Sequence, residues 1–191
     1  SFTGELSYEV NVNANYGLAV WEKIIEAGAE FNITPYGTET MHVLRAEKGF
    51  IIVGQDTDGS VHPYDINHGW AVVETKPFSF IGKRGMKRAD CVRPNRKELV
   101  GLKPKVADEV IPEGAQAVND PEQPIPMEML GHVTSSYYSA NLGHSIAMGM
   151  IKDGLNRIGE TVYYPLADGR VIEAEICSPI FYDPKGERQR V

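Results

Sequence analysis

Cysteine is scarce in this sequence. Only Cys91 and Cys177 occur, far apart, with no CxxC or Cys/His spacing that would suggest zinc. We interpret both as small, buried or half-buried apolar residues rather than nucleophiles, and a reducing cytoplasm suits them better than an oxidising compartment. No apolar run reaches the roughly 18 residues that a membrane span needs, so we predict no such span.

The sequence also lacks an excess of positive charge. Its net charge of −7 gives no general attraction to nucleic acid or to an anionic membrane. The basic residues are dispersed apart from a cluster between Lys83 and Lys97. We interpret that cluster as a solvated connector between domains rather than a phosphate or partner site.

Common signatures of catalysis and cofactor binding are missing as well. There is no GxGxxG, Walker, HExxH or GxSxG motif, and no two of the five histidines stand at metal-ligand spacing. The loop of residues 54–59 resembles a calcium loop only superficially, because the later bidentate glutamate is missing. We therefore predict no metal site, give no histidine a catalytic role, and expect Asp56 and Asp58 to cap neighbouring turns.

The overall composition is that of a globular protein. Hydrophobic residues make up 42% of the chain and charged residues 24%, so a core of useful size can be buried. The sequence opens on Ser-Phe-Thr-Gly-Glu, with no initiator methionine and no lead-in before a strand-like pattern. We expect the numbering to start inside a longer chain.

The first residues predict a strand and then a helix. Alternating apolar and polar residues over 5–12 indicate a half-buried strand. Asn13 or Asn15 can then cap a helix that Gly28 ends. The apolar residues at helical spacing in this stretch are Leu18, Trp21, Ile24 and Ile25.

A second helix is predicted from about residue 37 to residue 48. Thr34 is its candidate cap, and Gly49 ends it. Further along, the apolar stretch 68–73 is predicted to be one more buried segment.

The second half reads as short strands separated by Gly and Pro turns. This pattern predicts a small β-barrel or sandwich, with a hairpin turn at residues 167–170. The candidate strands are Glu98–Lys105, Ala115–Val118, Met127–Ser136, Ser145–Ile151, Thr161–Tyr164 and Val171–Cys177. The domain boundary is expected near residues 89–96, and the polar tail, residues 183–191, is expected to fray or to meet a partner.

Glu5 is a candidate ligand-binding residue. It follows Thr3 and Gly4 at the entry of the predicted strand, and glycine lets another group approach the backbone closely. A carboxylate placed there can accept the paired N–H donors that pterin, guanine and arginine present. From spacing alone, a solvated strand-end carboxylate is the better interpretation.

Arg45 is a second candidate, near the end of the second predicted helix. It lies two residues before Glu47, so the two side chains are not expected to face a shared partner. Its guanidinium can bind the carboxylates of a folate tail from a groove, or it can simply favour the negative end of the helix. Composition favours the second alternative.

Several ordered motifs, taken together, resemble the aminomethyltransferase family. That family includes the T-protein of the glycine cleavage system and the folate-binding part of dimethylglycine and sarcosine oxidases. Residues 2–9, Phe-Thr-Gly-Glu-Leu-Ser-Tyr-Glu, are similar to its Tyr-Thr-Gly-Glu-x-Gly-(Tyr/Phe)-Glu segment. Residues 44–49 and 54–56 are similar to its Leu-Arg-x-Glu-x-Gly and Gly-x-Asp elements.

The resemblance continues into the second half and covers nearly the whole chain. Phe-Ile-Gly-Lys at 80–83 is similar to a family motif, and residues 131–148 resemble part of the family's C-terminal barrel. Residues 53–59 and the ending at 178–188 resemble the alpha subunits of heterotetrameric sarcosine oxidases more than a free T-protein.

This resemblance implies an α+β fold. Residues 1–92 would be the C-terminal part of an aminomethyltransferase-like folate-binding domain (strand-helix-helix), and residues 93–191 a C-terminal antiparallel β-barrel. It also implies that Glu5 holds the pterin ring of tetrahydrofolate and that Arg45 supports the same site. Phe2 and Ser7 depart from the family's Tyr and Gly, which can alter the local geometry.

The same resemblance implies that several functional components lie outside this chain. The family's catalytic aspartate precedes the Thr-Gly-Glu segment, so we expect no catalytic residue here and no activity from these residues alone. Flavin and NAD are expected only in missing parts or in partner subunits of a sarcosine oxidase hetero-oligomer. The alternatives are a T-protein-like aminomethyltransferase of the glycine cleavage system and a non-catalytic folate-binding or assembly module.

Overall fold

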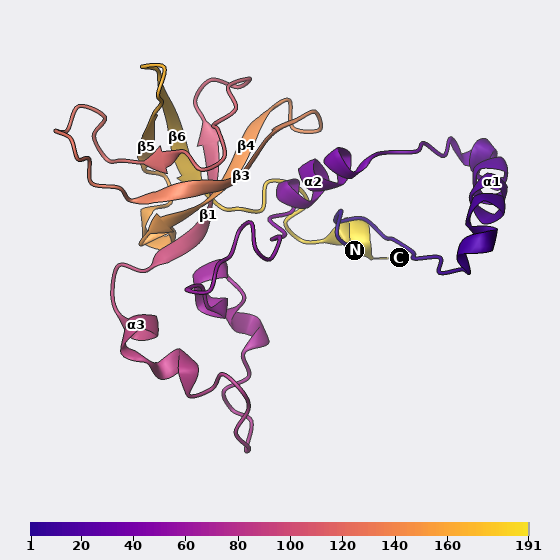
Figure 1. The fold of residues 1–191 in the computed structure, drawn as a ribbon, viewed down its shortest axis with the longest axis horizontal. Helices are drawn as coiled ribbons and strands as arrows, with labels where there is room; N and C mark the ends of the chain where they lie inside the picture. Colours follow the sequence, from indigo (N-terminus) through magenta and orange to yellow (C-terminus); the bar gives the residue numbers. More distant parts are fainter. Residues whose placement is uncertain (191) are drawn as a thin grey trace.

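Helices occupy the first half of the chain and strands the second, as Figure 1 shows for the computed structural model, which describes residues 1–190. The helices are α1 (Gly17–Gly28), α2 (Thr38–Glu47) and α3 (Ala89–Val92). The strands are β1 (Lys97–Pro104), β2 (Gln116–Ala117), β3 (Gly131–Ser139), β4 (His144–Lys152), β5 (Thr161–Pro165) and β6 (Val171–Cys177). Short 3-10 turns lie at Ala14–Tyr16, Ala29–Phe31, Pro63–Ile66, Gly69–Ala71, Gly85–Lys87, Gly154–Arg157 and Glu187–Gln189.

The predicted strand over residues 5–12 is wrong. This segment is extended, but it pairs with no strand among residues 1–190, and Tyr8 is 83% exposed. A strand is held by a hydrogen-bonded ladder and by burial of one face, and the described part of the chain offers this segment neither. The apolar and polar side chains alternate along this segment, but neither of its faces is buried in a sheet.

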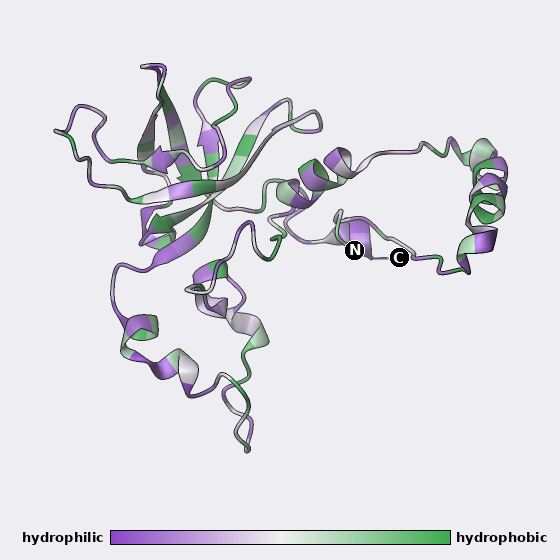
Figure 2. Cartoon of the chain, in the orientation of Figure 1, coloured by the Kyte–Doolittle hydropathy of each residue, from purple (hydrophilic) through white to green (hydrophobic). Residues whose placement is uncertain are grey.

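Helix α1 confirms the prediction made from apolar spacing. Asn13 begins the 3-10 turn before it, where its side chain accepts a hydrogen bond from the backbone N–H of Asn15 at 3.0 Å. The helix ends at Gly28, as predicted. No residue of α1 is buried, and Figure 2 shows the helix, with several apolar residues along it, at a distance from the barrel.

Helix α2 confirms the second predicted helix but not its cap. Gly37 is the capping residue and makes no side-chain hydrogen bond. The prediction for Thr34 is wrong, because it lies too far before the helix, and its hydroxyl donates to the carbonyl oxygen of Asn32 instead. Gly49, at φ +67°, takes the left-handed conformation that ends the helix.

The predicted buried segment at 68–73 is also wrong. It contains one 3-10 turn, and Trp70 is 79% exposed because no described element packs over it. The neighbouring His68 ring contacts the carbonyl oxygen of Ile66 at 2.7 Å. No helix within residues 1–190 has the length and apolar character to cross a membrane.

All six predicted strands are confirmed, although β3 begins at Gly131, four residues after its predicted start at Met127. They form one antiparallel sheet in the order β2-β3-β4-β1-β6-β5, and β5 and β6 are joined by the predicted hairpin turn, with Gly169 at φ +86°. The sheet curls, so that its two edges meet at a single bridge between Val118 and Tyr163. Their backbone groups exchange hydrogen bonds of 2.9 and 3.0 Å. The result is a barrel-like sheet that is not continuously closed.

Two apolar clusters hold the barrel together and attach α2 to it. The larger lies inside the sheet, and includes the fully buried Leu102, Tyr164 and Ile176. The smaller joins Ala46 of α2 to Ile146 of β4 and to further residues of β1 and β4. Close packing of this kind excludes water and fixes the orientation of α2 on the outside of the barrel.

The basic connector is only partly solvated. Arg96 is largely buried and binds Asp65 through two hydrogen bonds, of 2.8 and 2.6 Å, as well as Asp90. One member of the predicted solvated cluster therefore links the 3-10 turn at Pro63–Ile66 to α3, immediately before β1. The proposed division of the chain after residue 92 falls between α3 and β1.

Candidate functional site

The Thr-Gly-Glu turn rests directly on the end of α2. Gly4 is buried and has a φ of +83°, a conformation that favours glycine. A Cβ atom at this position would lie 2.2 Å from Cγ of Lys48, the residue that follows α2. The Thr-Gly-Glu motif and the Leu-Arg-x-Glu-x-Gly motif are thus neighbours in space.

Lys48 is held from its far end by a residue distant in sequence. Its side chain is only 6% exposed, and its ammonium group donates to the backbone oxygen and, at 3.0 Å, to Oδ2 of Asp183. Because both ends of the Lys48 side chain are fixed, it forms a rigid surface against which Gly4 packs. The turn is therefore positioned by α2 and by the segment that follows β6.

Asp183 organises the chain that follows it. Its carboxylate accepts hydrogen bonds from the backbone N–H groups of Glu187 at 2.9 Å and Arg188 at 3.2 Å. Desolvation opposes its ionisation. The hydrogen bond from Lys48 and the two backbone donors outweigh that effect and hold the pKa of Asp183 below its ordinary value.

Glu5 lies at the surface of this arrangement. Its side chain is 45% exposed, and Nη1 of Arg188 donates to Oε1 at 3.3 Å. The other carboxylate oxygen, Oε2, has no protein hydrogen-bond partner among residues 1–190. Glu5 can therefore accept donors from a ligand that approaches from solvent.

Arg45 occupies a different kind of place. Its side chain is fully buried, and its guanidinium donates to Asp56 at 2.6 Å, to the carbonyl oxygen of Phe50 at 3.1 Å and to Ser135 at 2.6 Å. It does not reach the surface, so it cannot contact a ligand that stays in the solvent-exposed part of the site. This geometry favours a supporting role, in which Arg45 attaches α2 to β3.

Asp56 is the acceptor at the centre of that attachment. Besides Arg45, its carboxylate accepts hydrogen bonds from the backbone N–H of Ile52 and from the hydroxyl groups of Thr134 and Ser135. The prediction that Asp56 and Asp58 cap nearby turns is confirmed, since Asp58 accepts from the N–H of Ser60. The buried ion pair between Asp56 and Arg45 was not predicted.

Glu47 fixes the end of α2 on the other side. Its carboxylate accepts from Ser139 at 2.6 Å and from Asn141 at 2.9 Å, while its backbone oxygen accepts from the N–H groups of residues 181 and 182. Arg45 and Glu47 therefore reach different partners, which confirms that they do not share one. Both are buried, so α2 cannot shift without breaking this network.

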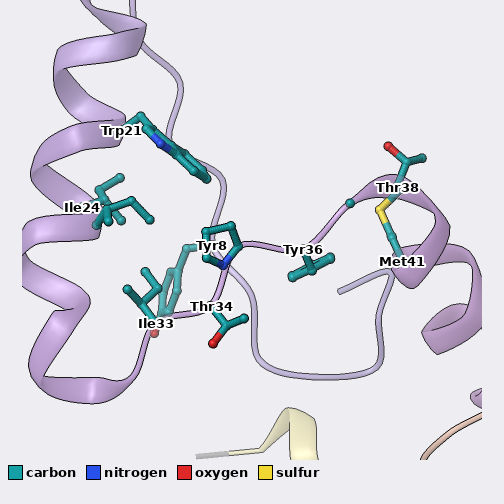
Figure 3. Close-up of a pocket in the computed structure, with 11 residues that line it drawn as sticks. Tyr8, Trp21, Ile24, Ile33, Thr34, Tyr36, Thr38 and Met41 are labelled. Carbon is teal, nitrogen blue, oxygen red and sulfur yellow. The ribbon is translucent and has the colours of Figure 1, made fainter.

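An open apolar hollow lies beside the segment that follows Glu5. It has a volume of about 550 Å³ and is formed by three parts of the chain, namely residue 8, α1 and residues 33–41 (Figure 3). Aromatic and aliphatic side chains dominate it, and two threonines also line it. Its lining includes Tyr8, Trp21, Ile24, Ile33, Tyr36 and Met41. Such a surface suits a flat, largely apolar group.

Neither cysteine is among the residues that form this site. Cys91 and Cys177 are both free, and burial raises the pKa of Cys177 to about 11, so it stays a thiol at neutral pH. In residues 1–190, no group of three or more metal-ligating side chains gathers in one place.

Sequence reasoning missed the contacts of Lys48, Asp183 and Arg188, because their partners lie 135 or 183 residues away along the chain. It also missed the buried ion pair that Asp56 forms with Arg45. The Asp-Pro-Lys-Gly-Glu-Arg stretch at 183–188 offered a weak signal, because Asp followed by Pro and Gly favours a turn. It did not reveal what that turn touches.

Two family models match the chain in succession. The GCVT N-terminal domain matches residues 1–76, and the glycine cleavage T-protein C-terminal barrel domain matches residues 97–183. The crystal structure of glycine cleavage system aminomethyltransferase T from Bartonella henselae resembles the whole chain with a TM-score of 0.79 and 25% identity, and the match covers 49% of that protein.

Curated relatives extend well beyond the length of this chain. Sarcosine oxidase subunit alpha from Corynebacterium sp. (strain U-96) is 48% identical over 99% of the chain, and the one from Rhizobium meliloti (strain 1021) is 36% identical over 100%. The chain spans only about one fifth of the length of these two proteins. An aminomethyltransferase from Halothermothrix orenii is 34% identical over 84% of the chain, which covers 43% of that protein.

Proposed function

Because the chain belongs to the glycine cleavage T-protein family, we propose that it forms part of a tetrahydrofolate-binding unit within a sarcosine oxidase alpha subunit. The observation that carries this proposal is the Thr-Gly-Glu turn, which presents the half-exposed Glu5 from a rigid support on α2. The extent and level of its similarity to the sarcosine oxidase subunits favour that parent protein over others.

The residues present fit a folate. The carboxylate of Glu5 has a free oxygen to accept the N–H groups of the pterin edge, in hydrogen bonds strengthened by its charge. Tyr8, three residues further along, lines the apolar hollow, where a flat ring can be buried. Arg45 supports the site from within by keeping α2 in place.

The role of this chain is binding and orientation. In the complete protein, sarcosine would be converted to glycine at a flavin held elsewhere, with release of peroxide. Bound tetrahydrofolate would supply the amine nucleophile that takes up the one-carbon unit. Holding that amine in place beside a reactive carbon raises its effective concentration, which is the contribution of Glu5 and its support.

The other components are proposed to lie outside this chain. Flavin and NAD would be bound by other parts of the alpha subunit or by the partner subunits of a hetero-oligomer. The free thiols of Cys91 and Cys177 fit a cytoplasmic location, where thiols remain reduced.

Replacing Glu5 with glutamine in the full-length protein is expected to weaken tetrahydrofolate binding by roughly tenfold or more. The substitution keeps the shape but removes the charge, and a hydrogen bond to a charged group contributes about 1.5–3 kcal/mol. Anaerobic calorimetric titration measures the change. Glu9→Gln is the matched control, since Glu9 lies on the same extended segment and is exposed. Full affinity in Glu5→Gln, or a larger loss in Glu9→Gln, would rule out the assignment to Glu5.

A T-protein-like aminomethyltransferase is the second candidate, favoured by the similarity to the enzymes from Halothermothrix orenii and Bartonella henselae. Sarcosine-dependent release of peroxide by the complete protein is expected under the oxidase proposal. Aminomethyl transfer that requires a lipoyl carrier protein, without peroxide, would support the aminomethyltransferase instead. Folate binding with neither activity would indicate an assembly or binding module.

A further inference from the structure

The chain that follows the barrel returns to the Thr-Gly-Glu turn. Figure 1 shows the 3-10 turn Glu187–Gln189 beside the first residues of the chain, near α2. The return begins where the backbone N–H groups of Phe181 and Tyr182 donate to the carbonyl oxygen of Glu47, both at 2.9 Å. We refer to residues 182–190 as the return segment.

The return segment has a fixed internal shape. Asp183 accepts the N–H groups of Glu187 and Arg188, and it is held in turn by Lys48. Gly186, at φ +65°, allows the chain to reverse before the 3-10 turn at Glu187–Gln189. Arg188 therefore projects from a turn that is tied to the end of α2.

Arg188 contacts the Thr-Gly-Glu turn through both its backbone and its side chain. Its carbonyl oxygen accepts the backbone N–H of Leu6 at 3.2 Å, and its guanidinium donates to Oε1 of Glu5 at 3.3 Å. The same guanidinium lies 5.3 Å from the centre of the Tyr182 ring, which limits its freedom to move away. Glu5 is thus held by backbone and side chain together.

We propose that Arg188 is a positioning residue for folate binding, and that the return segment sets the place and direction of the Glu5 carboxylate. This inference rests on the proposed function. Arg188 occupies one side of Oε1, while Oε2 remains available to a ligand. A carboxylate so fixed loses less freedom when it accepts a ligand, so binding is tighter.

The test uses the full-length protein and anaerobic titration with tetrahydrofolate. Arg188→Gln is expected to weaken binding by roughly threefold to tenfold, and Arg188→Lys to restore part of the loss. In kinetic assays, the KM for tetrahydrofolate should rise while kcat stays unchanged. Arg170→Gln is the matched control, because Arg170 is an exposed, ion-paired arginine in the β5–β6 hairpin. It should leave affinity unchanged.

A double-substitution cycle separates this inference from the function it rests on. If Arg188 acts through Glu5, adding Arg188→Gln to Glu5→Gln should cause no further loss. Equal losses with and without Glu5, or an unchanged affinity in Arg188→Gln while Glu5→Gln binds weakly, would overturn the positioning role alone. Full affinity in Glu5→Gln would instead overturn the folate assignment of Glu5, and the inference with it.

Discussion

Replacing Asp56 with asparagine is expected to destabilise the contact between α2 and the barrel by about 3–5 kcal/mol, since it leaves the guanidinium of Arg45 buried without a counter-ion. Both side chains of this pair are fully buried. A charge in such a place depends on its partner, because no water is available to replace it. The asparagine amide also introduces donors where the hydroxyl groups of Thr134 and Ser135 require an acceptor.

Hydrogen exchange in the intact protein measures this effect at the amides of α2 and β3, where local opening should become much more frequent. Asp58→Asn is the control. Asp58 lies two residues away and accepts from Ser60 at an exposed position, so its loss should cost about 1 kcal/mol or less. Changing Arg45 to methionine in the Asp56→Asn protein should recover stability. Equal protection in the two single variants would contradict the role given to the buried pair.

Replacing Gly4 with alanine is expected to displace the Thr-Gly-Glu turn and to weaken tetrahydrofolate binding by more than tenfold. Alanine in a left-handed conformation costs about 1–2 kcal/mol by itself. The added Cβ would also lie 2.2 Å from Cγ of Lys48, a side chain that is held at its far end by Asp183 and has little room to move. The turn must therefore leave its support, and Glu5 moves with it.

Calorimetric titration of the full-length Gly4→Ala protein with tetrahydrofolate measures this loss. Gly82→Ala provides the control, since Gly82 has a similar φ of +95° but no atom within 4 Å of an added Cβ. Gly82→Ala introduces similar backbone strain but no steric clash, and it lies outside the proposed folate site. It should therefore bind tetrahydrofolate normally. Normal binding by Gly4→Ala would show that the turn does not need its support on Lys48.

The second half of the fold could be predicted from the sequence because its strands supply one another's partners. The alternation of apolar and polar residues, together with the glycine turns, located all six strands. The apolar face that this alternation predicted is buried inside the barrel-like sheet. The strand predicted over residues 5–12 failed for the same physical reason. Its alternation is equally clear, but no described strand pairs with it.

The candidate site was predictable only in part. Glu5 and the end of α2 were found because short motifs mark them, and the structure brings them together through Gly4 and Lys48. The role of Asp56 was missed because a buried ion pair with residue 45 leaves no local pattern. Asp183 and Arg188 were missed because their contacts depend on the path of the whole barrel between them and residue 5.

The contact between Arg188 and Glu5 has a consequence for how this region folds. The two residues are separated by 183 positions, so their contact closes a loop that contains nearly the whole chain. Closing so long a loop is entropically unfavourable until the barrel has brought its ends near one another. During synthesis, the contact between Glu5 and Arg188 therefore cannot form until the residues up to Arg188 have been made. The Thr-Gly-Glu turn reaches its final shape only after the ribosome has completed the barrel and the residues beyond it.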